Sequence, residues 1–234
     1  LDIAHHDQKD YRQPRSLRTH PWLGPTLDEC KALYDPRHFL DFTQASVRSQ
    51  FDRSDTVLQR VRSSAGRSRQ IWTDLQMLPA TPGPQELNSY LRAVWHVANA
   101  IAGLSGPPLT ERRFLLGFPA RAAALNRPGL YAGLLGLLGA PNISTDTLWG
   151  WLAMWQTAYH ALPAEKALPR LHPHRSAYYH KAFEALLSNP QPQAVLWPLL
   201  HTWSLAASLL PPQSDDLRDW QEALTQAGLF VPNF

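Results

Sequence analysis

The sequence predicts a mainly α-helical fold: an antiparallel helical bundle or array with a short β segment at its N-terminus. Three observations lead to this prediction. Apolar residues recur at steps of three and four over long segments, which is the spacing that places them on one face of an α-helix. The 21 prolines among the 234 residues separate these segments and indicate helix boundaries. Alternation of apolar and polar residues, the pattern of a strand, is convincing only at Leu1, Asp2 and Ile3.

The composition supports a folded core and excludes several classes of protein. A hydrophobic content of 44% over 234 residues is enough for one substantial core. The net charge of +3 is too small to indicate a nucleic-acid-binding protein by itself. Cys30 is the only cysteine, which excludes an internal disulfide and a cysteine-based zinc cluster. The longest apolar stretch, 196–210, contains Pro198 and His201 and is too short to cross a bilayer. We therefore expect a soluble, cytoplasmic protein without a membrane partner.

We expect the chain to divide at residue 25. Residues 1–25 would hold the end of a strand and a connecting segment, because residues 8–26 are polar, rich in arginine and interrupted by three prolines. Residues 26–234 would form the helical domain.

The helical domain is expected to open with a short helix over residues 26–35. Thr26 is placed to cap its N-terminus, and two acidic residues in the first turn suit the positive end of the helix dipole. Pro36 would end this helix, because the residue before a proline avoids helical backbone geometry.

A long helix is predicted over residues 39–78, where one stripe runs without a break. The stripe consists of Phe51, Ser54, Leu58, Val61, Ala65, Ser68, Trp72 and Leu75. A flanking stripe carries Arg53, Arg60 and Arg67 at intervals of seven residues. This arginine stripe either forms the solvated face of an amphipathic helix or steers an anionic ligand, since guanidinium groups bind phosphate through paired hydrogen bonds.

Further helices are predicted down the chain, divided by turns that contain proline or glycine. They cover residues 85–104, 110–126, 130–140, a segment that Ser144 caps and whose apolar face ends at Leu162, and then about 176–188, 193–210 and 215–229. Pro119 is expected to break the helix at 110–126 into two pieces.

The first candidate chemistry lies at the opening residues. A carboxylate that alternates with apolar residues on a strand is how phosphoryl-transfer enzymes hold a divalent metal ion, and Asp2 fits that position. His5, His6 and Asp7 follow where the strand would reach the site. The alternative is that Asp2 is an ordinary exposed strand residue.

The order of these features resembles the nucleotidyltransferase superfamily, in particular the branch that includes aminoglycoside nucleotidyltransferases. The shared features are a strand ending in a carboxylate, a polar linker, a short helix closing on the sequence KALYDP (31–36), a long helix and a bundle. The resemblance implies that residues 1–25 are the end of a truncated nucleotidyltransferase sheet with its linker. It also implies that residues 26–234 are the helical half that closes over the acceptor.

The resemblance further implies the site residues and the cofactors. Asp2 would be the third catalytic carboxylate, would ligate Mg²⁺ and would orient or deprotonate the acceptor hydroxyl. A nucleoside triphosphate would supply the nucleoside monophosphate, and the acceptor would be a small molecule or a protein. The residues we assign to substrate binding are His5, His6, Asp7, Arg48, Arg53, Trp95 and His96.

One part of the superfamily pattern is missing from the 234 residues. The Gly-Ser turn followed by a pair of carboxylates, which carries the metal and nucleotide in that superfamily, does not occur. Together with the absence of an initiator methionine, this indicates a fragment or a processed product of a longer chain. We therefore expect that these residues alone do not catalyse nucleotidyl transfer.

Two other functions remain open. The first is a non-catalytic helical interaction module, in which the arginine stripe or an exposed tryptophan face meets a partner protein or a second copy in a homodimer; it should expose a large apolar patch. The second is a ribonuclease resembling the HEPN family, with Arg92 stabilising phosphate and His96 moving a proton, although the spacing of the two residues departs from that family. Nucleic-acid binding is otherwise not expected, because no aromatic residues interleave the arginine stripe.

Two further clusters have a chemical and a structural interpretation. His172, His174 and His180 are either a metal-binding set or part of a loop that leads into a helix. Trp149 and Trp151 lie on different faces of their predicted helix, so at least one should lie outside the core, where it could line an acceptor pocket.

Overall fold

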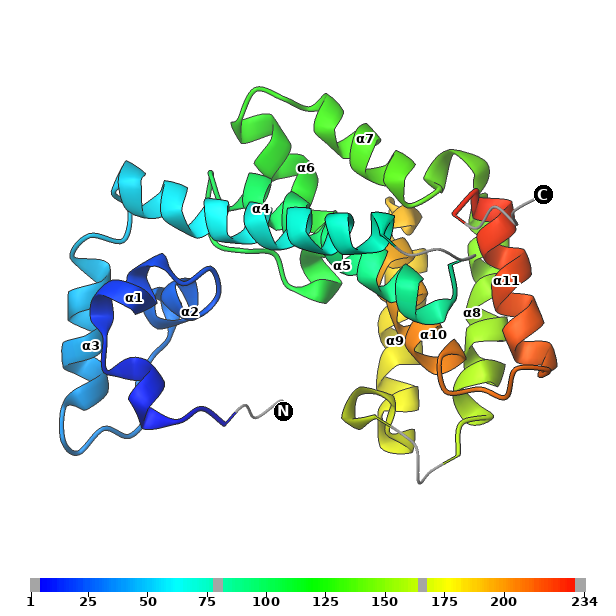
Figure 1. Cartoon of the computed structure of the whole chain (residues 1–234), viewed down its shortest axis with the longest axis horizontal. Coiled ribbons are helices and arrows are strands. Elements are labelled where there is room, and N and C mark those ends of the chain that lie inside the picture. The colour runs from blue at the N-terminus through cyan, green and yellow to red at the C-terminus, as the bar shows by residue number, and fades with distance from the viewer. Residues whose placement is uncertain (1–4, 78–81, 164–167, 230–234) are drawn as a thin grey trace.

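The computed structural model describes residues 5–77, 82–163 and 168–229, and within these ranges every regular element is a helix (Figure 1). This confirms the mainly α-helical prediction. The predicted strand at Leu1, Asp2 and Ile3 lies outside the described residues, and His5, His6 and Asp7 after it have no strand structure.

The helices follow one another along the chain and are joined by short 3₁₀ segments. The α-helices are α1 (Pro14–Thr19), α2 (Leu23–Glu29), α3 (Phe39–Arg48), α4 (Ser54–Gln76), α5 (Pro84–Ala102), α6 (Phe114–Ala124), α7 (Gly129–Leu137), α8 (Thr145–His160), α9 (Ser176–Leu187), α10 (Leu196–Ala207) and α11 (Asp215–Ala227). The 3₁₀ segments are η1 (Gln8–Tyr11), η2 (Glu111–Arg113), η3 (Ala140–Asn142), η5 (Pro169–Leu171), η6 (Pro173–Arg175) and η7 (Pro192–Val195).

Residues 5–53 form a small helical unit, which we call the N-terminal unit, at one end of the molecule (Figure 1). Its helices α1, α2 and α3 enclose a separate core of Leu17, Leu27, Val47 and Phe51. Residues 8–26, which we expected to be a connecting segment, are therefore largely helical.

Two of the three prolines of this segment lie in the first turn of a helix, and the third, Pro21, lies in the turn before α2. Pro14 is the first residue of α1, and Pro25 lies in the first turn of α2. A proline in the first turn costs no hydrogen bond, because the N–H groups there have no partner within the helix.

The predicted helix at 26–35 is wrong at both ends. Helix α2 begins at Leu23, and the Thr26 hydroxyl donates to the Trp22 carbonyl (2.9 Å) instead of capping the helix. The helix ends at Glu29, and the following residue, Cys30, has extended backbone geometry (ψ 156°). Asp35 instead caps the next helix, α3: its carboxylate accepts hydrogen bonds from the backbone N–H groups of Phe39, Leu40 and Asp41 at 3.1, 2.7 and 3.0 Å.

The single helix predicted over 39–78 is two helices, α3 and α4, with a turn at residues 49–53 between them. The turn directs Phe51 into the core of the N-terminal unit. The buried face of α4 also differs from the predicted stripe: it consists of Thr56, Arg60, Ser64, Ser68 and Ile71, whereas Leu58 and Trp72 are exposed.

Small side chains explain which face of α4 is buried. Helix α4 packs along α5, and the Ser68 hydroxyl donates to the Ala93 carbonyl at 2.8 Å. Serine and alanine at the contact let the two helix backbones approach closely, so this face packs well although it is less apolar than its neighbour.

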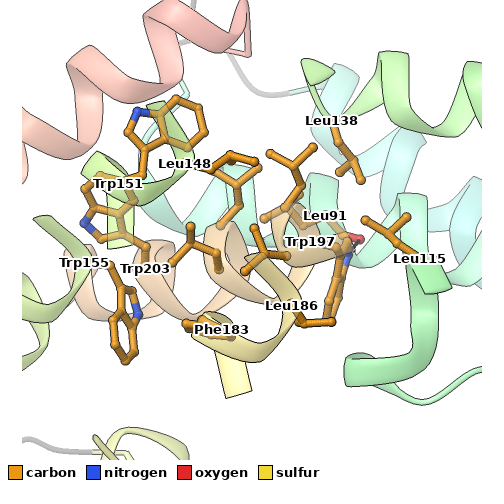
Figure 2. Close-up of a cluster of buried hydrophobic side chains, with 14 of the residues drawn as sticks. Leu91, Leu115, Leu138, Leu148, Trp151, Trp155, Phe183, Leu186, Trp197 and Trp203 are labelled. Carbon is orange, nitrogen blue, oxygen red and sulfur yellow. Dashed lines mark hydrogen bonds between the residues drawn. The ribbon is translucent and has the colours of Figure 1, made fainter. Parts of the chain in front are cut away.

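The main core lies among α5 to α11 and is rich in tryptophan (Figure 2). The indole N–H of Trp197 on α10 donates to the Leu91 carbonyl of α5 at 2.9 Å. Trp220 on α11 donates in the same way to the Ser204 hydroxyl of α10 at 3.1 Å. Helix α10 is therefore the central element, and buried hydrogen bonds hold it from both sides.

The helices predicted for this part of the chain are present with small shifts at their ends. The exception is the helix at 110–126, where Pro119 was expected to cause a break. Helix α6 (Phe114–Ala124) continues through Pro119, and only the residues before Phe114 form a separate 3₁₀ turn, η2. Across the residues that the structure describes, no helix is both long and apolar enough to cross a membrane.

Candidate functional site

The N-terminal unit carries a groove of about 470 Å³ between its first residues and the segment that joins α2 to α3. Its lining residues are His6, Gln8, Tyr11, Thr26, Leu27, Cys30, Asp35, Pro36, Arg37, Phe39 and Leu40. The volume is in the range of small-molecule sites. We call this the N-terminal groove.

The segment 30–35 beside the groove exposes its apolar side chains. Leu33 is 93% exposed and Tyr34 is 83% exposed. Phe42 on α3 of the same unit is 70% exposed. Single exposed apolar residues are ordinary. Two adjacent exposed apolar residues in a loop, with a third in the next helix, indicate a surface that can contact another protein or domain.

The backbone of this segment is equally free. Within the described part of the chain, the N–H groups of residues 31–34 donate to no backbone carbonyl. A non-helical segment whose backbone N–H groups lack backbone partners is able to donate them to a strand edge.

The polar groups of the groove suit recognition better than catalysis. The rings of His6 and Tyr11 lie edge to face, with their centroids 6.0 Å apart. Burial raises the pKa of the Tyr11 hydroxyl, and the nearby Cys30 and Asp10 raise it further. The Asp35 carboxylate is already occupied as the cap of α3, so it is not free to act as an acid or a base.

The first group of predicted site residues is only partly brought together. Asp2 lies outside the described residues. His5, His6 and Asp7 are exposed, and His6 alone among them lines the groove. The Asp7 carboxylate accepts the Lys9 backbone N–H (3.1 Å) and pairs with its ammonium group (2.9 Å), and these hydrogen bonds lower the pKa of Asp7. Asp7 therefore caps η1.

Arg48 and Arg53, which we predicted to bind substrate, make contacts within the chain and do not line the groove. The Arg48 guanidinium donates to the Asp28 carbonyl at 2.9 Å and so ties α3 to α2. Arg53 pairs with Asp55, with 3.1 Å between Nε and Oδ1.

Trp95 belongs to an aromatic stack and not to an acceptor wall. Its ring lies parallel to that of Trp22, with centroids 4.6 Å apart and an angle of 8° between the planes. On the other side lies Trp197 at 6.0 Å, and Trp197 in turn stacks on His201 at 4.7 Å. The stack joins the N-terminal unit to helices α5 and α10.

His96 lies beside this stack on α5. Its ring centroid is 5.2 Å from that of Trp95, and its buried Nδ1 atom has no hydrogen-bond partner among the described residues. Burial lowers the pKa of His96, and the charges of Arg92 and Arg67 lower it further. Trp95 and His96 therefore form a location separate from the N-terminal groove.

The arginine stripe is not one continuous solvated face, because Arg60 is buried with 8% of its surface exposed. Its guanidinium donates to the carbonyls of Phe51 (2.9 Å) and Arg18 (3.0 Å) and lies 3.8 Å from the centre of the Phe51 ring. Burial lowers the pKa of Arg60, while the nearby Asp52 and Asp28 act in the opposite direction. Arg60 fastens the N-terminal unit to α4.

The two remaining clusters follow their structural interpretations. Within the described residues, no three His, Cys, Asp or Glu side chains lie close enough to hold a metal ion, and His180 instead approaches Glu184 at 3.3 Å. Trp151 is buried and Trp149 is exposed, which confirms that at least one of them lies outside the core.

A second cavity, of about 370 Å³ between α4, α5 and the end of α11, was missed by the sequence analysis. Trp72 lines it, and we had placed this residue on the buried stripe of the long helix. The stretch from Glu86 to Tyr90 at the start of α5 contributes the other wall. Local spacing gives no sign of this cavity, because its walls come from segments more than a hundred residues apart in the chain.

The chain matches no protein-family model, no curated protein and no solved structure. Its function is therefore argued from its own residues.

Proposed function

We propose that this chain is the helical, acceptor-binding part of a metal-dependent nucleotidyltransferase and works with a nucleotide-binding sheet that packs on its N-terminal unit. The observation that carries the proposal is the exposure of Leu33 and Tyr34 on a non-helical segment next to the groove that His6 lines, where the N–H groups of residues 31–34 donate to no backbone carbonyl. The groove is thus lined by His6, which follows the predicted strand, and by Asp35 and Pro36 of the KALYDP segment that leads into the bundle in the resembled superfamily.

The exposed apolar side chains of this surface favour contact with a second domain or protein that would bury them. Burying a large apolar side chain stabilises a structure by about 1.5–3 kcal/mol. Leu33 is 93% exposed and Tyr34 is 83% exposed, so neither side chain gains more than a small part of this stabilisation within the described residues. A domain that packs on the segment 30–35 would cover these side chains, and a strand that pairs with the segment would accept from the free N–H groups of residues 31–34.

The described residues do not themselves fit a magnesium site. No group of three metal-ligating side chains gathers among them. The proposal therefore assigns Mg²⁺ and the nucleoside triphosphate to the sheet. Asp2 is the residue of this chain that would orient or deprotonate the acceptor hydroxyl, and the N-terminal groove would receive part of the acceptor.

The test is a transfer assay on the native gene product with Mg²⁺, ATP labelled at its α-phosphate and a panel of acceptors that bear hydroxyl groups. We expect label on an acceptor, and a loss of about a hundredfold or more in rate on Asp2→Asn, as is typical when a proton-transfer group is removed. Asp10→Asn, a nearby exposed carboxylate that does not line the groove, is the matched control and should keep the wild-type rate. An unchanged rate with Asp2→Asn, or no labelled acceptor with the native product, would contradict the proposal.

The same exposed side chains also favour a second function, the non-catalytic interaction module. In that case Leu33→Ser with Tyr34→Ser should abolish binding of the partner protein, and no preparation should transfer label. In the transferase the double substitution should lower the rate of transfer, because the sheet no longer packs.

A further inference from the structure

The second cavity, which we call the α4–α5 pocket, lies at the far end of α4 from the N-terminal unit (Figure 1). It has a volume of about 370 Å³, and its lining residues are Trp72, Leu75, Pro82, Glu86, Leu87, Tyr90, Gly228 and Leu229. It shares no lining residue with the N-terminal groove, so an inference about it does not rest on the proposed transfer reaction.

Two aromatic rings form one side of the pocket. Trp72 on α4 is 48% exposed, and its ring centroid lies 6.3 Å from that of Tyr90 on α5, with the planes inclined at 51°. The Tyr90 hydroxyl donates to the Leu137 carbonyl at 2.8 Å, which fixes the ring. Two inclined rings thus present aromatic surface to the pocket, with Leu75 and Leu87 completing an apolar wall.

The charge of the pocket has one sign. Glu86 contributes a carboxylate, and no Lys, Arg or His is among the described lining residues. Burial raises the pKa of Tyr90, so its hydroxyl stays neutral at physiological pH.

The Glu86 carboxylate is held in place but its charge is not neutralised. Its Oε2 atom accepts the Gly83 backbone N–H at 2.9 Å at the start of α5, which is the half of a capping box that the N3 residue supplies. In the part of the chain that the structure describes, no basic side chain forms an ion pair with Glu86. The pocket therefore combines an unpaired, oriented carboxylate with aromatic faces.

We propose that the α4–α5 pocket binds a small organic cation, with its ammonium group near Glu86 and its apolar part against Trp72 and Tyr90. Aromatic faces attract cations because the ring quadrupole is negative above the plane, and a carboxylate adds Coulombic attraction where the site is partly desolvated. In an anion of the same size and shape, the charged group is repelled by Glu86 and has no cation–π attraction to the rings. The volume accommodates a ligand with a single ring and an ammonium group.

The proposal is tested by calorimetric titration of the 234-residue chain with benzyltrimethylammonium, and with phenylacetate as an anion of similar shape. We expect a Kd of about 1 mM or below for the cation and no saturable binding of phenylacetate. Glu86→Gln should weaken binding of the cation by about fivefold or more, since glutamine still accepts the Gly83 N–H but carries no charge. Trp72→Ala should weaken it to a similar extent.

Trp149→Ala is the matched control, because Trp149 is an exposed tryptophan on α8 that does not line the pocket. It should leave the Kd unchanged, and circular dichroism of each variant shows whether the fold is kept. The proposal would be overturned if phenylacetate bound as tightly as the cation. It would also be overturned if the cation showed no binding at about 10 mM, tenfold above that Kd, or if Glu86→Gln and Trp72→Ala both left the Kd unchanged.

Discussion

At the scale of single residues, His201 shows how far burial changes the chemistry of a side chain. It lies on the central helix α10, stacks on Trp197, and places Nδ1 3.0 Å from the Asn88 Oδ1 atom. Because Oδ1 is an acceptor, Nδ1 carries the proton and the ring is neutral. Burial is the main reason that the pKa of His201 falls to about 3, and the charges of Arg170 and Arg92 lower it further.

This low pKa predicts a loss of stability in mild acid. The unfolded chain takes up the proton near pH 6.5 and the folded chain only near pH 3, so acidification favours unfolding. Between pH 7.5 and 5.5 the free energy of unfolding should fall by about 1.4 kcal/mol from this residue. Urea unfolding at the two pH values should show a smaller fall for His201→Gln, whereas substitution of the exposed His174 by Gln should leave the fall unchanged. An equal fall in wild type and His201→Gln would contradict the assignment.

Arg60 makes a second prediction at this scale. Arg60→Met removes the donor to two backbone carbonyls, those of Arg18 and Phe51, and leaves them without this partner in a buried place. We expect a loss of about 2–4 kcal/mol in the free energy of unfolding. Arg62→Met, on the exposed face of the same helix, should change it by less than about 0.5 kcal/mol. Similar values for the two variants in urea unfolding would show that Arg60 does not fasten the N-terminal unit.

The sequence predicted neither the buried, neutral state of His201 nor the structural role of Arg60. Arg60 follows the same spacing of seven as Arg53 and Arg67, and only the tertiary contact with Phe51 separates it from them. Asp2 shows the opposite case: the pattern around it predicts a role, and the position lies outside the described residues. Spacing identifies faces of helices, but which face becomes buried depends on the partner helix.

At the scale of elements, Trp22 is the contact that holds two groups of helices together. It precedes α2 and stacks face to face on Trp95 of α5, so it joins the N-terminal unit to the rest of the chain. Stacking of this kind is worth about 0.5–1.5 kcal/mol beyond the area that it buries.

Trp22→Ala should therefore loosen the N-terminal unit without unfolding the main core. We expect trypsin to cleave at Arg48 and Arg53, which flank the turn between α3 and α4, about five to ten times faster than in wild type. Trp22→Phe should keep part of the protection. If Trp22→Ala is cut there no faster than wild type, the stack does not restrain the unit.

The helices themselves were predicted well where caps and apolar faces agree, as for the helix that Ser144 caps. The break between α3 and α4 was missed because residues 49–53 contain neither glycine nor proline and Phe51 continues the apolar stripe. The turn forms because Phe51 packs into the core of the N-terminal unit, which is a tertiary cause. Conversely, Pro14 and Pro25 suggested a connecting segment, although both positions are compatible with the first turn of a helix.

At the scale of the whole molecule, the large core and the small N-terminal unit have different roles in the proposed function. The tryptophan-rich core among α5 to α11 provides a rigid body, and the N-terminal unit presents the groove and the exposed segment 30–35 at one end (Figure 1). The mainly α-helical class was predictable from the periodicity of apolar residues and the placement of prolines. The groove was not, since it forms where His6, Cys30 and Phe39 meet through the packing of helices that the sequence did not indicate.

The most direct test of the central claim is native mass spectrometry and peptide sequencing of the gene product isolated from its own cells under non-denaturing conditions. The account predicts a species heavier than the 26.4 kDa of this chain. It should contain a Gly-Ser turn followed by paired carboxylates, in the same polypeptide or in one bound to it. A species of 26.4 kDa, or a multiple of that mass with this sequence alone, would contradict the claim that the chain works with a nucleotide-binding sheet.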